Sequence, residues 1–188
     1  MTTNVALGLA GLDDQLMELA RAGDRRAFAA LVERHGTRLA EFCIKMVGDR
    51  RTGEDVAQET WLAVWATRAR YRGRDRLVAF LFAIARNRCR NALRARRRFT
   101  RVIVLDDADR DHGGPTSLDA MLERERQRRV HAAAARLPAK LREALLLRFV
   151  AGLDYPQISD AVGRNESTVR SRVFHGLRKL RQLIEEAP

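Results

Sequence analysis

The residue types best suited to chemistry lie near the C-terminus, in the stretch NESTVRSRVFHGLRKL at 165–180. Asn165 is a typical N-cap and Glu166 adds a negative charge to the first turn, so a helix is predicted to begin here. Apolar residues recur at helical spacing and should form its buried stripe: Val169, Val173, Leu177, Leu180 and Ile184. The other side carries groups that can contact base edges and phosphates: Thr168, Arg170, Ser171, Phe174, His175 and Arg178.

Phe174 does not fit the buried stripe, because it lies far round the helix from it. We therefore expect this ring to be exposed, where it can contact a base edge or a thymine methyl group. The alternative is a solvated basic face with one exposed aromatic side chain, since single exposed apolar residues are common.

A shorter helix is predicted just before this one. Asp154 and Gln157 have the spacing of a capping box, Pro156 is tolerated in a first turn, and Gly163 can end the helix. A short helix, a turn with glycine and a longer basic helix form the helix-turn-helix arrangement, whose second helix can enter a DNA major groove.

A second basic surface is predicted on a helix over 77–98. Between Ile84 and Arg101 there are eight arginines and no acidic residue. The side opposite the apolar stripe carries Arg86, Asn87, Arg90, Asn91 and Arg94. With Tyr71 and Phe80 nearby, basic side chains can hold phosphates while aromatic rings stack on exposed bases.

A third surface is acidic and partly apolar. On the helix that starts near Glu54, one side carries Asp55, Gln58, Glu59, Leu62 and Trp65. Such a face in a chain of net charge +12 indicates a protein partner, because DNA would repel it. An ordinary solvated acidic face is the simpler alternative, and a metal site at Asp55 and Glu59 lacks further ligands.

The composition agrees with a nucleic-acid partner. The chain has 188 residues, 46% of them hydrophobic, with 36 Lys and Arg against 24 Asp and Glu. This balance favours a polyanion, with nucleic acid ahead of an anionic membrane surface. We expect a cytoplasmic protein with no membrane insertion, since no apolar run approaches the roughly 20 residues that a span needs and no secretory signal is evident.

The cysteines and histidines give no catalytic or metal centre. Cys43 and Cys89 are far apart in the sequence and lie in helical patterns, so reduced, buried thiols are expected rather than a disulfide or a zinc site. The four histidines, His35, His112, His131 and His175, do not group with acidic residues at catalytic spacing. We expect no cofactor and no enzymatic activity.

Helical spacing almost throughout the chain predicts an all-α protein with two small helical domains. We expect a flexible N-terminus over 1–11, one domain over 12–99, an exposed acidic linker over 100–116 and a second domain over 117–188. Within the first domain, helix boundaries are predicted at N-caps Asp13 and Asp24, at Gly48, and at a capping box formed by Thr52 and Asp55.

Taken together, these stretches resemble the extracytoplasmic-function (ECF) group of the sigma-70 family of bacterial RNA polymerase sigma factors. GEDVAQETWLAVW is similar to the polymerase-docking helix of the family, and VAFLFAIARNRCRNALRARRR to its minus-ten reader. LREALLLRFVAGLDYPQISDAVGRNESTVRSRVFHGLRKLR resembles its minus-thirty-five domain. The resemblance extends from Leu16 to about Leu183.

The resemblance implies an alternative sigma factor that binds core RNA polymerase, selects promoters and melts the minus-ten element. The acidic face would bind the clamp helices of the largest polymerase subunit, the helix with the arginine stripe would hold melted DNA, and the C-terminal helix would read duplex DNA. An anti-sigma factor is a further implied partner. Asn91, Phe80 and His175 depart from residues frequent in the family, so the resemblance does not give the preferred promoter.

Two other functions remain open at this point. A stand-alone helix-turn-helix regulator would explain the C-terminal domain but would leave the acidic face and the arginine helix without a role. A nucleic-acid enzyme with an attached DNA-binding domain would need a nucleophile, metal or phosphate-loop constellation. Binding to core polymerase would distinguish the sigma factor from the regulator.

Overall fold

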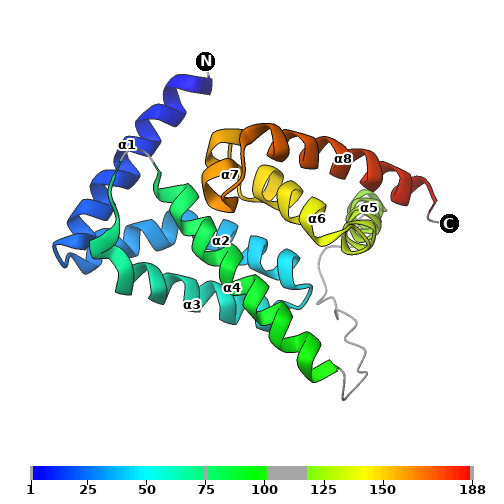
Figure 1. Ribbon diagram of the computed structural model, residues 1–188, viewed down its shortest axis with the longest axis horizontal. Helices are drawn as coiled ribbons and strands as arrows, with labels where there is room; N and C mark the ends of the chain where they lie inside the picture. Colours follow the sequence, from blue (N-terminus) through cyan, green and yellow to red (C-terminus); the bar gives the residue numbers. More distant parts are fainter. Residues whose placement is uncertain (1, 74–75, 101–117, 187–188) are drawn as a thin grey trace.

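The computed structural model describes residues 2–73, 76–100 and 118–186, and this part of the chain is helical without a strand (Figure 1). The all-α prediction is therefore confirmed. A 3-10 turn at Arg68–Arg70 follows the third helix, and a π turn at Leu146–Val150 follows the sixth. The helices are α1 Thr2–Arg21, α2 Arg25–Val47, α3 Arg50–Thr67, α4 Leu77–Thr100, α5 Leu118–Ala135, α6 Ala139–Leu145, α7 Tyr155–Val162 and α8 Glu166–Glu185.

Local capping chemistry sets several helix ends as predicted. The Asp24 carboxylate accepts hydrogen bonds from two backbone N–H groups at the start of α2, at 2.8 and 3.1 Å. Gly48 ends that helix with φ at 78°, a left-handed conformation that favours glycine. Asp154 and Gln157 form the predicted capping box of α7, and the Asn165 side chain caps α8.

Two predicted caps are wrong. Asp13 lies inside α1 and is buried, where its carboxylate accepts hydrogen bonds from α2 instead of from its own backbone. The N-cap of α3 is Asp49, whose carboxylate accepts the Thr52 N–H at 2.7 Å, so no capping box forms with Asp55. An aspartate three residues earlier begins the helix before Thr52 can do so. The helix α1 covers most of the segment 1–11, and the flexibility of this segment stays a prediction.

The N-terminal domain packs α1, α3 and α4 around α2. The approach of α3 to α2 is very close, because a Cβ atom at Gly53 would lie only 2.5 Å from the Ile44 Cα. In the interior, the rings of Phe42 and Phe82 meet edge to face at 5.2 Å between centroids. Figure 1 shows α4 crossing in front of α2, which places the arginine helix on the outside of this domain.

The two cysteines are buried free thiols, as the sequence indicated. Cys43 on α2 and Cys89 on α4 are neighbours in the core, and a hydrogen bond between them, together with burial, raises the pKa of the Cys43 thiol. A raised pKa keeps the reactive thiolate scarce, so these side chains serve as core packing.

In the C-terminal domain, α8 lies against α6, and a glycine of α8 lies at their contact. A Cβ atom at Gly176 would meet the Leu145 side chain at 3.0 Å. This contact corrects the predicted stripe, because Leu177 is 44% exposed whereas Gly176 is buried. The buried positions on α8 are Val169, Val173, Gly176 and Leu183, with Leu180 packed beside them.

The two domains are packed together. Leu147, Leu153 and Ile158 from the C-terminal half are fully buried in the same hydrophobic cluster as α2 and α4. Figure 1 shows α6 and α7 beside these N-terminal helices. The predicted linker lies outside the described residues, apart from its first position. Nothing in the helical periodicity had indicated this shared core.

Candidate nucleic-acid interface

The α7–turn–α8 unit presents the long face of α8 to the exterior. Gly163 ends α7 with φ at 63°, and Asn165 accepts the Thr168 N–H at 3.0 Å at the start of α8. These two caps fix a tight turn between the helices. The helix-turn-helix arrangement predicted from the sequence is therefore present.

The outward face of α8 holds most of the residues predicted to contact DNA. Phe174 is 65% exposed, and its ring meets the His175 ring edge to face at 5.6 Å. Ser171 and Arg178 are also exposed on this helix, whereas Thr168 is half-buried in the first turn. The expectation that Phe174 lies outside the core is confirmed, and the contact with DNA stays a prediction.

Arg170 is oriented by its own domain. Its Nε donates to the Glu166 carboxylate at 2.9 Å, and its guanidinium lies 4.3 Å from the centre of the Tyr155 ring on α7. A cation held over an aromatic face keeps its direction while losing little side-chain freedom on binding. Arg170 is thus positioned at the end of α8 that enters a groove in helix-turn-helix proteins.

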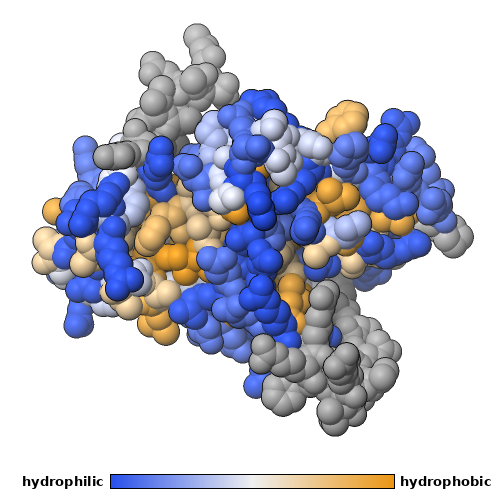
Figure 2. Space-filling model, viewed as in Figure 1, coloured by the Kyte–Doolittle hydropathy of each residue, from blue (hydrophilic) through white to orange (hydrophobic). Residues whose placement is uncertain are grey.

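The predicted stripe on α4 divides into an exposed and a covered part. Asn87, Asn91 and Arg94 are exposed, and Arg90 is half-buried. Figure 2 shows a hydrophilic band over this region of the molecule. Arg86 is different, because it is 9% exposed and its Nε donates to Glu143 of α6 at 2.5 Å. In this arrangement Arg86 binds the C-terminal domain and has no access to DNA.

The aromatic residues near α4 are also covered. Tyr71 is 3% exposed, and its hydroxyl donates a hydrogen bond to the Asp14 carboxylate of α1. Its ring lies 5.4 Å from that of Phe80, which is half-buried. The structure brings these two rings together as predicted, but Tyr71 would have to leave Asp14 and the core to stack on a base.

The acidic face of α3 is formed as the spacing predicted. Asp55, Gln58, Glu59 and Leu62 are exposed, and Leu62 is 69% accessible. Glu59 also accepts a hydrogen bond from Arg88 of α4 at 2.8 Å. An exposed leucine between carboxylates supplies the mixture of apolar area and charge that suits a protein interface.

Trp65 belongs less to this face than the sequence suggested. It is half-buried, and the centre of its ring lies 5.0 Å from the centre of the Phe28 ring. The Arg68 guanidinium covers one face of the Trp65 ring, 4.0 Å from its centre. Val64 is fully buried, as expected. The exposed face is therefore centred on Asp55, Glu59 and Leu62.

A cavity of about 440 Å³ lies between the two domains, and sequence reasoning missed it. Its polar lining consists of six basic side chains and one carboxylate: Arg86, Arg90, Arg94, Lys140, Arg164, Arg172 and Glu143. The sole sequence signal was Glu143, an acidic residue in the apolar run LREALLL, which indicates a buried carboxylate in need of a basic partner.

Within the described residues, no group of three or more His, Cys, Asp or Glu side chains is placed to hold a metal ion. The helices in this part of the chain also include none that is long and apolar enough to cross a membrane. The surfaces present are those of a two-domain helical protein with a helix-turn-helix, an arginine-rich helix and an acidic face.

Comparisons with known proteins place the chain in one family. Residues 31–99 match the family model of sigma-70 region 2, and residues 127–180 match that of sigma-70, region 4. The RNA polymerase sigma-H factor of Pseudomonas aeruginosa is 33% identical over 183 residues, which cover 93% of each chain. The ECF RNA polymerase sigma-E factor of Haemophilus influenzae is 32% identical over 181 residues, or 92% of this chain and 93% of the other.

Solved structures show the same fold. CnrH, in a complex with the cytosolic domain of CnrY, matches with a TM-score of 0.73 and 25% identity over 94% of this chain and 99% of that one. RpoE of Bartonella quintana, in a complex with the anti-sigma factor NepR, matches with a TM-score of 0.71 and 24% identity over 86% and 98%.

The fold defines a two-domain helical protein with a helix-turn-helix, and the matched families make it a DNA-binding protein. The chain belongs to the sigma-70 family of RNA polymerase sigma factors, and within it to the ECF group. Both predicted domains have their counterpart in the matched regions, so the family resemblance seen in the sequence is confirmed.

Proposed function

We propose that this protein is an alternative sigma factor that binds core RNA polymerase, directs it to specific promoters and melts the minus-ten element. The observation that carries the proposal is the presence of three different surfaces on one chain of this family. The α8 face suits duplex DNA, the α4 stripe suits a single strand, and the α3 face suits a protein.

We assign the minus-thirty-five element to Arg170, Ser171, Phe174, His175 and Arg178 of α8, with Thr168 at its start. The minus-ten element is assigned to Asn87, Arg90, Asn91 and Arg94 of α4. Arg86 joins this second set only after the domains separate, because Glu143 of α6 holds it in the arrangement described here. Tyr71 and Phe80 join it only after Tyr71 leaves Asp14, which lies in its own domain. Contact between Arg86 and DNA therefore requires a different domain arrangement.

The polymerase-binding surface is assigned to Asp55, Gln58, Glu59 and Leu62, with Trp65 at its edge. Its carboxylates and exposed leucine provide the mix of charge and apolar area that protein interfaces use. The clamp helices of the largest polymerase subunit are the partner that family membership suggests.

Run-off transcription tests the proposal. Purified protein added to core polymerase should give transcripts with defined starts on genomic fragments, without ATP hydrolysis for promoter opening. Core polymerase alone is the control. Absence of any promoter-specific transcript across the genome would contradict the assignment as a sigma factor, whereas DNA binding without core binding would favour the stand-alone regulator.

An anti-sigma factor is the proposed regulator. The similar structures of CnrH and RpoE were both determined in complexes, with CnrY and with the anti-sigma factor NepR. We expect co-purification of this chain from its own cells to recover one protein that blocks run-off transcription when added back. Recovery of core polymerase alone, under conditions where the factor is inactive, would argue against such a partner.

A further inference from the structure

The cavity between the domains is lined by six basic side chains and one acidic side chain. Its cationic residues come from three places: α4, α6, and the α7–α8 unit. Glu143 is the one acidic side chain in the lining, and it is engaged by Arg86 at 2.5 Å. In the described part of the chain, Arg90, Lys140, Arg164 and Arg172 have no ion pair.

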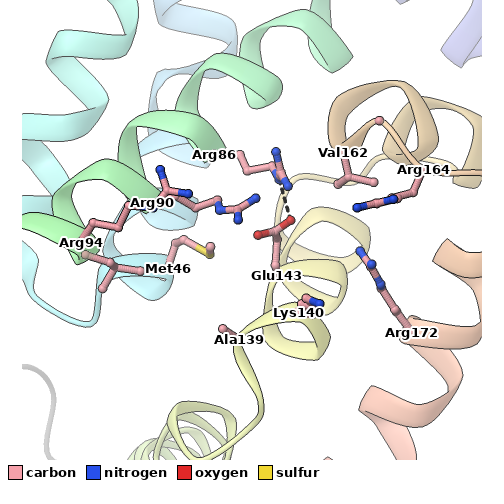
Figure 3. Close-up of a pocket in the computed structure, with 12 residues that line it drawn as sticks. Met46, Arg86, Arg90, Arg94, Ala139, Lys140, Glu143, Val162, Arg164 and Arg172 are labelled. Carbon is pink, nitrogen blue, oxygen red and sulfur yellow. Dashed lines mark hydrogen bonds and ion pairs between the residues drawn. The ribbon is translucent and has the colours of Figure 1, made fainter. Parts of the chain in front are cut away.

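The cations face one another across this space. Figure 3 shows Arg164 and Arg172 extending from one side toward the Arg86–Glu143 pair, with Arg90 on the other side. Like charges held this close repel each other, so closing the domains places an electrostatic cost at the cavity. An anion bound there would remove that cost and use the arginines as hydrogen-bond donors.

The residue types in the lining indicate which kind of anion would bind. Arginine presents a planar fork of N–H donors that matches phosphate oxygens, and several such forks can share one chain of phosphates. One part of the wall is apolar and is formed by Met46, Leu93 and Val162. The volume of about 440 Å³ is within the range of sites for small molecules.

We propose that this interdomain cavity is a binding site for a polyphosphorylated small molecule of the nucleoside-polyphosphate class. The arginines of both domains bind the phosphates, and the apolar wall contacts the nucleoside. Because the site exists only while the domains are together, the ligand stabilises the closed arrangement and keeps Arg90 and Arg94 from DNA.

Isothermal titration calorimetry on the full chain, without polymerase, tests the site with two probes. Inorganic tripolyphosphate supplies the phosphate chain alone, and ATP adds a nucleoside. We expect saturable binding of one molecule per chain for both probes, with ATP the tighter. Tighter binding of tripolyphosphate would overturn the nucleoside part, and absence of saturable binding by either probe would overturn the site.

Paired variants distinguish a built site from general positive charge. Arg164→Ala with Arg172→Ala removes two cations of the cavity and should weaken binding about tenfold or more. Lys179→Ala with Arg181→Ala removes two exposed cations of α8 away from the cavity and should leave affinity unchanged. If both double variants lost the same affinity, the loss would reflect the net charge of the chain, and the proposal would be wrong.

The opposite wall gives a second check. Arg90→Ala changes the N-terminal domain alone and should also weaken binding, because the site spans both domains. Unchanged affinity would contradict an interdomain site. Circular dichroism confirms folding of every variant. These measurements involve neither core polymerase nor a promoter, so they can fail while the proposed sigma function stands, and the reverse also holds.

Acidic peptides are the competing occupant. An octa-glutamate peptide that binds where the phosphates do not would overturn the proposal in favour of a protein segment. The acidic stretch of the chain itself is tested with Asp106→Asn and Asp107→Asn. If tripolyphosphate bound to this variant but not to the natural chain, the acidic stretch would be the occupant of the cavity. The proposal of a small-molecule ligand would then be wrong.

Discussion

His35 is held in its neutral form by the atoms around it. Its Nε2 lies 2.8 Å from the Asp13 carboxylate of α1, which also accepts from Arg34, and its Nδ1 lies 2.9 Å from an Arg38 nitrogen. Because the Arg38 guanidinium can only donate, Nδ1 is the acceptor and Nε2 carries the proton. Burial lowers the pKa of His35, and the opposing attraction of Asp13 does not reverse this direction.

This arrangement predicts a pH dependence of stability. The unfolded chain takes up the proton near pH 6.5 and the folded chain at a lower pH, so the free energy of unfolding falls as the pH drops below about 6.5. Urea unfolding between pH 7.5 and 5 should show this slope in the natural chain and a reduced slope in His35→Gln. An identical slope in both proteins would exclude His35 as its source.

Phe174 allows binding to be separated from stability. Because its ring is 65% exposed, Phe174→Ala should leave the free energy of unfolding within about 0.5 kcal/mol of the natural value. Loss of an apolar contact with a base should weaken binding to a minus-thirty-five duplex by about 1 kcal/mol. Fluorescence anisotropy with labelled promoter DNA measures the second effect.

The matched control for Phe174 is Leu183 on the same helix. Leu183 is 5% exposed, so Leu183→Ala should lower the free energy of unfolding by about 2–5 kcal/mol. Promoter binding under folding conditions should change little. If Phe174→Ala bound the promoter as well as the natural chain does, this ring would have no part in recognition.

At the scale of elements, the contact between α2 and α3 depends on a single missing side chain. A Cβ atom at Gly53 would come within 2.5 Å of the Ile44 backbone, so Gly53→Ala must push the helices apart. We expect a loss of about 1–3 kcal/mol in the free energy of unfolding. Gly36 on α2 is the control, because a Cβ atom there would meet only the Val32 side chain, at 3.9 Å.

Gly36→Ala should be neutral or stabilise the protein by up to about 1 kcal/mol, since alanine favours the helix. Thermal unfolding of both variants measures the two effects. Equal behaviour of the two alanines would mean that α3 does not approach α2 as closely as the structure shows.

The exposed face of α3 is tested by reversing its charge. Asp55→Arg with Glu59→Arg should abolish binding to core polymerase, because the face would then repel the surface that complements it. The helical fold should persist, since both side chains are exposed. A pull-down with core polymerase measures binding, and circular dichroism monitors the fold. Undiminished binding would remove this face from the interface.

At the scale of the whole molecule, the Arg86–Glu143 pair links the two domains. Both side chains are largely buried, at 11% and 9% exposure, and the hydrogen bond between them measures 2.5 Å. Removing one partner of a buried pair leaves the other charge uncompensated, which costs about 3–5 kcal/mol. The closed arrangement is therefore sensitive to this one contact.

Glu143→Gln should shift the chain toward separated domains, and small-angle X-ray scattering should show a larger radius of gyration. The control is Glu185→Gln, which removes an exposed pair with Arg181 and should change nothing. An unchanged radius in Glu143→Gln would mean that the apolar contacts of Leu147 and Ile158 hold the domains together without the ion pair.

Much of the fold and of the site follows from the sequence alone. The sequence predicted the helices, the capping box of α7, the cap at Asn165 and the exposure of Phe174, because each depends on residues within a few positions of one another. The same local spacing placed Asp55, Glu59 and Leu62 on one face. Periodicity and capping are local properties, so local sequence contains them.

The tertiary structure decided what happens between helices. It buried Arg86 against Glu143, 57 positions away, formed a cationic cavity, and placed Gly176 instead of Leu177 against Leu145. These outcomes depend on which helices meet and at what distance, and helical spacing carries no information on either. The sequence pattern of an arginine stripe is the same whether DNA, a carboxylate or a neighbouring domain contacts it.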